Sequence, residues 1–159
     1  MDDVKFTLTG DVERPLRLRF SDFQQLVAEY QVPDVSQIDL KRQGGAVTLE
    51  GLLRLAVVKP TAKYLTLHAS KDDFHASIPL DAVRDKAIVI YRLGDQPLSA
   101  KAGGPIRFFI PNFAACHTDE IDECANVKFV DRIELTAERG HDNRPHDEKQ
   151  HAELHQRQS

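Results

Sequence analysis

Apolar and polar residues alternate over several short stretches of the chain, which predicts strands that are buried on one face. Leu16, Leu18 and Phe20 alternate with two arginines in this way. Further strands are expected at residues 4–9, 36–40, 64–69, 74–78, 87–91, 106–110 and within 127–136. The strands 64–69 and 74–78 are expected to form a hairpin, and 87–91 is apolar enough to be a central strand.

Helical spacing appears in fewer places than strand alternation. Ser21 and Gln24 form a capping box, which predicts a helix that continues until Pro33. The apolar face of this helix is expected to comprise Phe23, Leu26, Val27 and Tyr30. A second helix is expected over 49–57, and a short one near Asp81. Because strands outnumber helices and do not alternate with them regularly, the pattern indicates a mixed, strand-rich α+β fold.

The composition changes after Glu138. Residues 139–159 contain only Ala152 and Leu154 as apolar side chains, and four of the seven histidines. Such a segment buries too little apolar surface to offset the entropy lost on ordering. We therefore expect one domain over residues 1–138 and a disordered, polar, histidine-containing tail over 139–159.

Charge and composition exclude several classes of function. A net charge of -4 creates no strong field, so neither nucleic acid nor an anionic membrane is an expected partner. No apolar run is long enough to cross a bilayer or to serve as a signal peptide. Two cysteines cannot staple a secreted scaffold, so a cytoplasmic location is expected.

Several blocks of sequence follow one another in an order that a known family shares. They are GLL at 51–53, AKYLTLH at 62–68, FHASIPLDA at 74–82, YRLGDQPL at 91–98, GGPIRFFIP at 103–111 and VKFVDRIEL at 127–135. In these blocks, and in its opening from Gly10 to Leu26, the chain resembles the molybdopterin-binding domain of the sulfite oxidase type. The resemblance implies that family's fold as a single domain, with a molybdenum cofactor in a cleft lined by loops.

The resemblance also implies which residues would face such a cofactor. It selects Gly103, Gly104, Arg107, His75 and Lys128 as cofactor-binding residues. Considered without the resemblance, the GGPIR stretch has two interpretations. It could present backbone N–H groups and a guanidinium to an anion, or it could be a tight turn into a buried strand with Arg107 in an ion pair.

A molybdenum ligand of the family is missing. In the family, a cysteine just after the strand expected at 36–40 supplies a thiolate to molybdenum, whereas residues 38–45 here read IDLKRQGG. Lysine and arginine cannot replace a soft thiolate. The expected function is therefore a molybdopterin-dependent oxidoreductase-like domain that is degenerate at the metal site and binds a pterin or another small anionic ligand.

Two alternatives to this function stay open. One is a non-catalytic protein-binding or assembly module that uses the same fold and docks a partner through the acidic loop at 116–124. The other is an active enzyme with an unusual metal ligand and a redox partner protein. Histidines 68 and 75, on neighbouring expected strands, could point into the cleft or have a structural role.

The loop at 116–124 carries a possible metal site. Cys116, His117 and Cys124 could bind a soft or borderline cation, although the two cysteines lack the short spacing of a zinc ribbon. A disulfide, or two free thiols beneath an acidic surface, are the other interpretations. The four carboxylates of this loop would repel a phosphate dianion, unlike the corresponding loop of the family.

Overall fold

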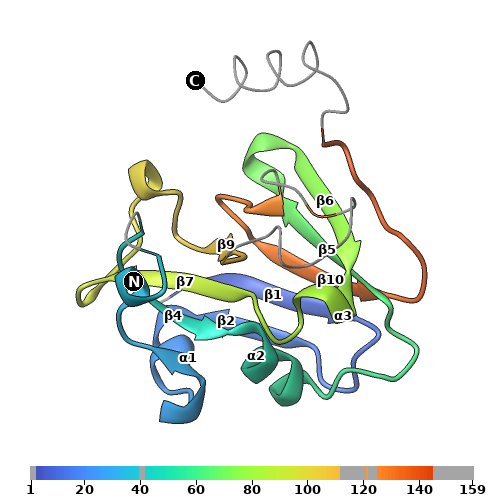
Figure 1. Ribbon diagram of the computed structural model, residues 1–159, viewed down its shortest axis with the longest axis horizontal. Coiled ribbons are helices and arrows are strands. Elements are labelled where there is room, and N and C mark those ends of the chain that lie inside the picture. Colours follow the sequence, from blue (N-terminus) through green and yellow to red (C-terminus); the bar gives the residue numbers. More distant parts are fainter. Residues whose placement is uncertain (1–2, 40–41, 112–120, 122–124, 145–159) are drawn as a thin grey trace.

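The computed structural model describes residues 3–39, 42–111, 121 and 125–144 of the chain, which form two sheets packed face to face (Figure 1). Within this part, the first sheet has the strand order β2-β1-β10-β5-β6. Its strands are β1 (Val4–Gly10), β2 (Leu16–Arg19), β5 (Tyr64–Ala69), β6 (Phe74–Pro79) and β10 (Arg132–Thr136). β1 and β10 run parallel, and the other neighbours are antiparallel.

The second sheet has the order β3-β4-β7-β8, and β9 also pairs with β7. Its strands are β3 (Gln31–Val32), β4 (Gly45–Thr48), β7 (Ile88–Leu93), β8 (Gln96–Pro97) and β9 (Arg107–Phe109). All its pairs are antiparallel. The helices are α1 (Phe20–Gln24), α2 (Leu49–Ala56) and α3 (Leu80–Val83), with 3-10 turns η1 (Ala28–Tyr30), η2 (Val35–Gln37), η3 (Ser70–Asp72) and η4 (Ala100–Ala102). The expected mixed, strand-rich α+β class is confirmed.

β7 is buried on both faces, as its apolar sequence predicts. Val89 and Tyr91 pack into the main core, where Tyr91 stacks on Phe23 with 5.2 Å between ring centroids. Ile88 and Ile90 point the other way and join a second apolar cluster. The main core combines inward residues of both sheets with α2, whereas the second cluster covers the outer face of the second sheet. This outer face carries the candidate site described below.

The helix expected over residues 21–32 is wrong in length and in its cap. α1 ends at Gln24, and its capping box joins Arg19 and Asp22, whose carboxylate accepts the Arg19 backbone N–H at 2.7 Å. The side-chain amide of Gln31 donates to the carbonyls of Phe23 and Leu26 at 2.8 and 3.1 Å. Because a side chain from outside satisfies these terminal carbonyls, the chain leaves the helix and turns into η1.

Two expected strands differ in the structure. The first two residues of the strand expected at 36–40 belong instead to η2 (Val35–Gln37), because the Asp34 carboxylate accepts the Ser36 backbone N–H at 3.0 Å and favours a turn. Of the strand expected within 127–136, only β10 forms. The hairpin of β5 and β6, the helix over 49–56 and the strand at 107–109 follow the pattern.

The packed part of the chain extends beyond the boundary expected at residue 138. Residues 139–144 run along β6, the edge strand of the first sheet (Figure 1). The Ser77 hydroxyl accepts the Gly140 N–H at 2.8 Å, and the Asp142 carboxylate accepts the Ser77 N–H at 3.0 Å. Backbone groups of an edge strand need partners, and this segment supplies them without apolar side chains. Residues 139–144 are therefore hydrogen-bonded to β6, and residues 145–159 of the expected tail lie outside the described part.

Asp142 and Arg144 hold this segment on β6 through a buried ion pair. The shortest distance between the guanidinium and the carboxylate is 2.7 Å, and the side chains are only 6% and 4% exposed. Burial acts to raise the pKa of Asp142, but hydrogen bonds from Arg144 and from the backbone N–H of Ser77 outweigh it and lower the pKa to about 2. The carboxylate therefore stabilises the fold above the ordinary pKa of 3.8, and the effect disappears as the pH falls through about 2.

We expect Asp142→Asn to lower the free energy of unfolding at pH 7 by about 2 kcal/mol, the value of its pKa shift. Urea unfolding at pH 7 measures this loss, and the difference from wild type should shrink towards zero near pH 2. Asp95→Asn, in the exposed turn before β8, is the control and should change stability by less than about 0.5 kcal/mol. Equal stability of both variants at pH 7 would contradict the importance of this ion pair.

Candidate anion-binding site

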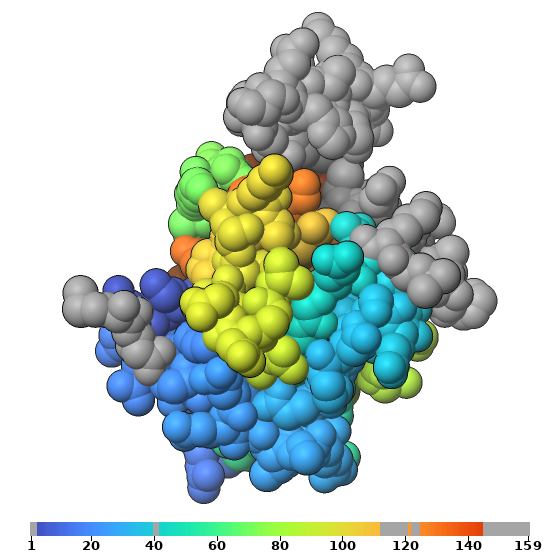
Figure 2. All heavy atoms as spheres, turned by 90° about the vertical axis from the view of Figure 1, so that its left-hand side faces the viewer, coloured from blue at the N-terminus to red at the C-terminus, as the bar shows by residue number. Residues whose placement is uncertain are grey.

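A pocket of about 220 Å³ opens on the outer face of the second sheet. Figure 2 shows this side of the molecule, where the yellow segment that contains η4 stands next to the cyan segment that leads into β4. The pocket is lined by Arg42, Gln43, Ile90, Leu93, Leu98, Ala102 and Arg107. Among the described residues, its lining therefore combines an apolar wall with two guanidinium groups and contains no carboxylate.

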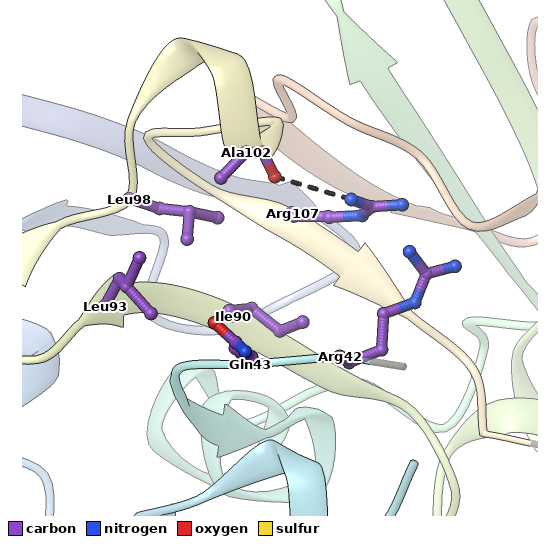
Figure 3. A pocket seen from close by; sticks show the side chains of 7 residues that line it. All are labelled: Arg42, Gln43, Ile90, Leu93, Leu98, Ala102 and Arg107. Atoms are coloured by element: carbon purple, nitrogen blue, oxygen red, sulfur yellow. Dashed lines mark hydrogen bonds between the residues drawn. The ribbon is translucent and has the colours of Figure 1, made fainter. Parts of the chain in front are cut away.

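Strand pairing brings Arg107 to this pocket. Arg107 on β9 lies opposite Ile90 on β7, so the two side chains share the outer face of the sheet. The 3-10 turn η4 packs over this face, and at the start of the turn the Ser99 hydroxyl accepts the Ala102 N–H. The Ala102 carbonyl in turn accepts a long hydrogen bond of 3.4 Å from the Arg107 guanidinium (Figure 3).

The two glycines of the GGPIR stretch are required by close packing. Gly103 has a φ of 93°, and a Cβ atom there would lie 3.1 Å from the Lys128 side chain and 3.3 Å from Arg107. At Gly104 a Cβ atom would overlap the carbonyl oxygen of Leu98. The structure thus brings Gly103, Arg107 and Lys128 close together, with Gly104 next to them, and of these four Arg107 lines the pocket.

Arg42 supplies the second positive charge. Its guanidinium stacks on the Phe109 ring, 5.1 Å from the ring centroid, and lies at the same end of the pocket as that of Arg107 (Figure 3). Leu93 and Leu98 line the opposite end. In the described part of the chain, the Nε atoms of Arg42 and Arg107 are the buried side-chain polar atoms without a hydrogen-bond partner.

The two arginines repel each other. Burial lowers the pKa of Arg107, and the positive charge of Arg42 lowers it further. Arg107 forms no ion pair with a described residue, so the interpretation of Arg107 as half of a structural ion pair has no support in this part of the chain. Guanidinium groups bind oxyanions through charge-assisted hydrogen bonds, and here two of them lie close together with buried Nε atoms that have no partner among the described residues.

His75 lies away from this pocket. It belongs to β6 at the far edge of the first sheet, where it pairs directly with His68 of β5. The neighbouring strands expected for these histidines are therefore confirmed, but neither imidazole lines the pocket.

The metal ligands expected at Cys116, His117 and Cys124 lie outside the described residues. Within the described ranges, no group of three or more His, Cys, Asp or Glu side chains is arranged to hold a metal ion. No helix in the same part of the chain is long and apolar enough to cross a bilayer.

The chain thus forms a mixed α+β domain of two packed sheets, with a cationic pocket on an outer face. The model of the family described as the oxidoreductase molybdopterin binding domain matches residues 43–144, so the chain belongs to this family. The crystal structure of the sulfane dehydrogenase SoxCD from Paracoccus pantotrophus has a similar fold, with a TM-score of 0.62 and 20% sequence identity. The match covers 87% of this chain but only 39% of that one. A search of curated proteins found no significant match.

Arg42 is the pocket residue that sequence reasoning missed. The stretch around it, LKRQGG, was considered only because it lacks the cysteine of the family. Nothing in the local pattern places Arg42 beside Arg107. A signal was nevertheless present. Two basic residues precede the pair Gly44-Gly45 in a segment where the resemblance places a cofactor contact.

We expect Arg107→Met to leave the free energy of unfolding unchanged or slightly higher in an anion-poor buffer. Methionine keeps the apolar stem and removes a desolvated charge that faces Arg42. Arg92→Met is the matched control on β7, because Arg92 donates to the Gly94 carbonyl at 3.0 Å, and it should cost about 1 kcal/mol. Chemical denaturation at low ionic strength measures both. A loss of several kcal/mol in Arg107→Met would show that a structural partner holds this arginine.

Proposed function

We propose that this domain is an oxidoreductase-like member of its family that is degenerate at the metal site and binds a small anionic ligand between Arg42 and Arg107. A pterin with its phosphate, or another small oxyanion, is the class of ligand that suits the pocket. The observation that carries the proposal is the pair of buried guanidinium Nε atoms without hydrogen-bond partners at one end of it.

Size and lining favour a small, partly apolar ligand. Pockets for drug-sized molecules usually measure about 300–1,000 Å³, and this one is about 220 Å³. An anionic group would sit between the guanidiniums and gain hydrogen bonds from donors that are already desolvated. The body of the ligand would lie against Leu93, Leu98 and Ile90, where apolar contact adds affinity without charge.

The donor set at the rim does not suit molybdenum. Molybdenum in this family requires a soft thiolate, according to the resemblance, and the corresponding stretch offers Arg42 and Gln43 instead. A guanidinium carries no lone pair for a metal, and its positive charge repels a cation. We therefore derive no redox step for this chain. Its proposed role is ligand binding, and the sulfane dehydrogenase activity named for SoxCD belongs to a chain of which this one spans less than half.

Thermal unfolding with inorganic phosphate and with sulfate tests the anion site. At a phosphate concentration tenfold above its Kd, wild-type protein should gain about 1.4 kcal/mol, which corresponds to a Tm increase of roughly 3–5 °C. Arg42→Met and Arg107→Met should each lose most of this gain, because a single guanidinium remains. The control is Arg54→Met on α2, where Arg54 pairs with Glu50 at 2.9 Å.

Each outcome separates the proposed function from its rivals. Loss of the gain in both pocket variants, with Arg54→Met like wild type, supports the anion site. The same Tm increase in all four proteins would mean a general salt effect and would reject the site. No increase in wild type would reject anion binding and favour the protein-binding module.

The degenerate metal site has its own test. Protein purified from a host that makes the molybdenum cofactor should contain no stoichiometric molybdenum and should not oxidise sulfite, because residues 38–45 supply no thiolate. Elemental analysis and a sulfite oxidation assay measure this. Stoichiometric molybdenum would contradict the proposal, and its loss in Cys116→Ser or Cys124→Ser would then identify a substitute ligand.

A further inference from the structure

Two histidines face each other across the hairpin of the first sheet, far from the anion pocket. His68 of β5 and His75 of β6 are direct cross-strand partners, and their Nδ1 atoms lie 2.8 Å apart. The side chains are only 7% and 13% exposed. At this distance and burial, the two nitrogens must share a hydrogen, since two lone pairs without one would repel each other.

The outer nitrogen of each ring meets a carboxylate. His68 Nε2 lies 3.0 Å from Oε1 of Glu134, and His75 Nε2 lies 2.9 Å from Oδ1 of Asp73. An ionised carboxylate only accepts hydrogen bonds, so both Nε2 atoms must carry a hydrogen and donate it. A neutral imidazole has a single N–H, which these outer contacts already use.

The four ring nitrogens therefore hold three hydrogens, and the pair carries one positive charge. Burial lowers the pKa of His68, and the charges of Arg132 and His75 lower it further, against the opposing effect of the Glu134 hydrogen bond. The shared proton lies between the two Nδ1 atoms, while the two Nε2 atoms donate to Glu134 and to Asp73.

The His75 ring contacts the segment that covers the edge of β6. His141 stacks on His75, with 4.2 Å between ring centroids and 19° between ring planes. Asn143 accepts the His75 backbone N–H at 2.8 Å and donates its own backbone N–H to the His75 carbonyl at 3.0 Å. The Asn143 side chain also donates to the Asp73 carbonyl at 2.7 Å. The ring orientation of His75 and the position of residues 141–143 are therefore linked.

We propose that the His68–His75 pair is a proton-operated latch: with one shared proton it holds residues 141–143 on β6, and it releases them when it gains or loses a proton. With a second extra proton, two Nδ1–H groups would collide across 2.8 Å. With none, two lone pairs would face each other. Either state turns the rings apart and disturbs the His141 stack, which frees the edge of β6 for pairing with another extended segment.

Among the described residues, the charged side chains that contact the pair lie on β10 and next to β6. Asp73 precedes β6, and Arg132 and Glu134 on β10 lie 3.9 Å from each other. His141 is the titratable neighbour from the C-terminal segment. The loss of stability at low pH follows from the lowered pKa of His68. The unfolded chain accepts this proton near pH 6.5, before the folded chain does, so stability falls as the pH drops below about 6.5.

Imidazole ¹⁵N shifts and amide hydrogen exchange from pH 5 to 9, with EDTA present, test the latch. Near the middle of this range, three of the four ring nitrogens of His68 and His75 should be protonated. Protection of the His75 and Asn143 amides, corrected for intrinsic exchange, should peak there and fall at least fivefold at both ends. The two limbs belong to the pair as a unit, as in any coupled titration.

Three variants assign the pH response. His68→Gln and His75→Gln should flatten the protection profile, because neither can share a proton in this way. His141→Phe keeps a stacked ring without a titratable group, so its profile should still have a maximum. A flat wild-type profile, two neutral rings at mid pH in the ¹⁵N spectrum, or loss of the maximum in His141→Phe would each overturn the latch. The ¹⁵N measurement on wild type stands even if a glutamine variant fails to fold.

Discussion

The burial of β7 on both faces is the constraint on which the rest of the structure depends. Its alternate residues belong to two apolar clusters, Val89 and Tyr91 to the main core and Ile88 and Ile90 to the outer one. A sheet that is apolar on both faces must be covered twice. The first sheet and α2 cover one face, while η4 and the segment before β4 cover the other. The pocket forms where this second cover is incomplete.

The pocket has an electrostatic cost that the fold offsets only in part. Arg42 stacks on the Phe109 ring, and Arg107 makes a long hydrogen bond to the Ala102 carbonyl. The Nε atom of each arginine nevertheless has no partner among the described residues. Buried charges are normally paired, because desolvation is expensive. A site that keeps two like charges in place without a counter-charge among the described residues is better suited to binding than to stability. Gly103 leaves room for the side chains of Lys128 and Arg107, and Gly104 leaves room for the Leu98 carbonyl.

The Arg42–Arg107 pair and the His68–His75 pair lie on different sheets and differ in how their nitrogen atoms are hydrogen-bonded. In the pocket on the second sheet, the Nε donors of Arg42 and Arg107 have no partner among the described residues, whereas at the edge of the first sheet every ring nitrogen of His68 and His75 has a partner. A bound anion would satisfy the two arginines of the proposed site, whereas the proposed histidine latch depends only on a proton. Residues 139–144 contact the histidine pair at the edge of the first sheet. This polar segment is held there by hydrogen bonds and by the Asp142–Arg144 ion pair.

Local patterns of apolar and polar residues were enough to predict the class of fold, the hairpin, α2 and the central strand, since alternation and helical spacing are strong there. The sequence also placed the GGPIR stretch as a candidate site by resemblance. It could not determine the length of α1, which Gln31 ends from outside the helix, nor the packing of 139–144, which depends on unpaired groups of β6. Only the tertiary structure brought Arg42 to Arg107 and His68 to His75. Such contacts join residues distant in sequence, and strand register and the folding of loops over a sheet decide them.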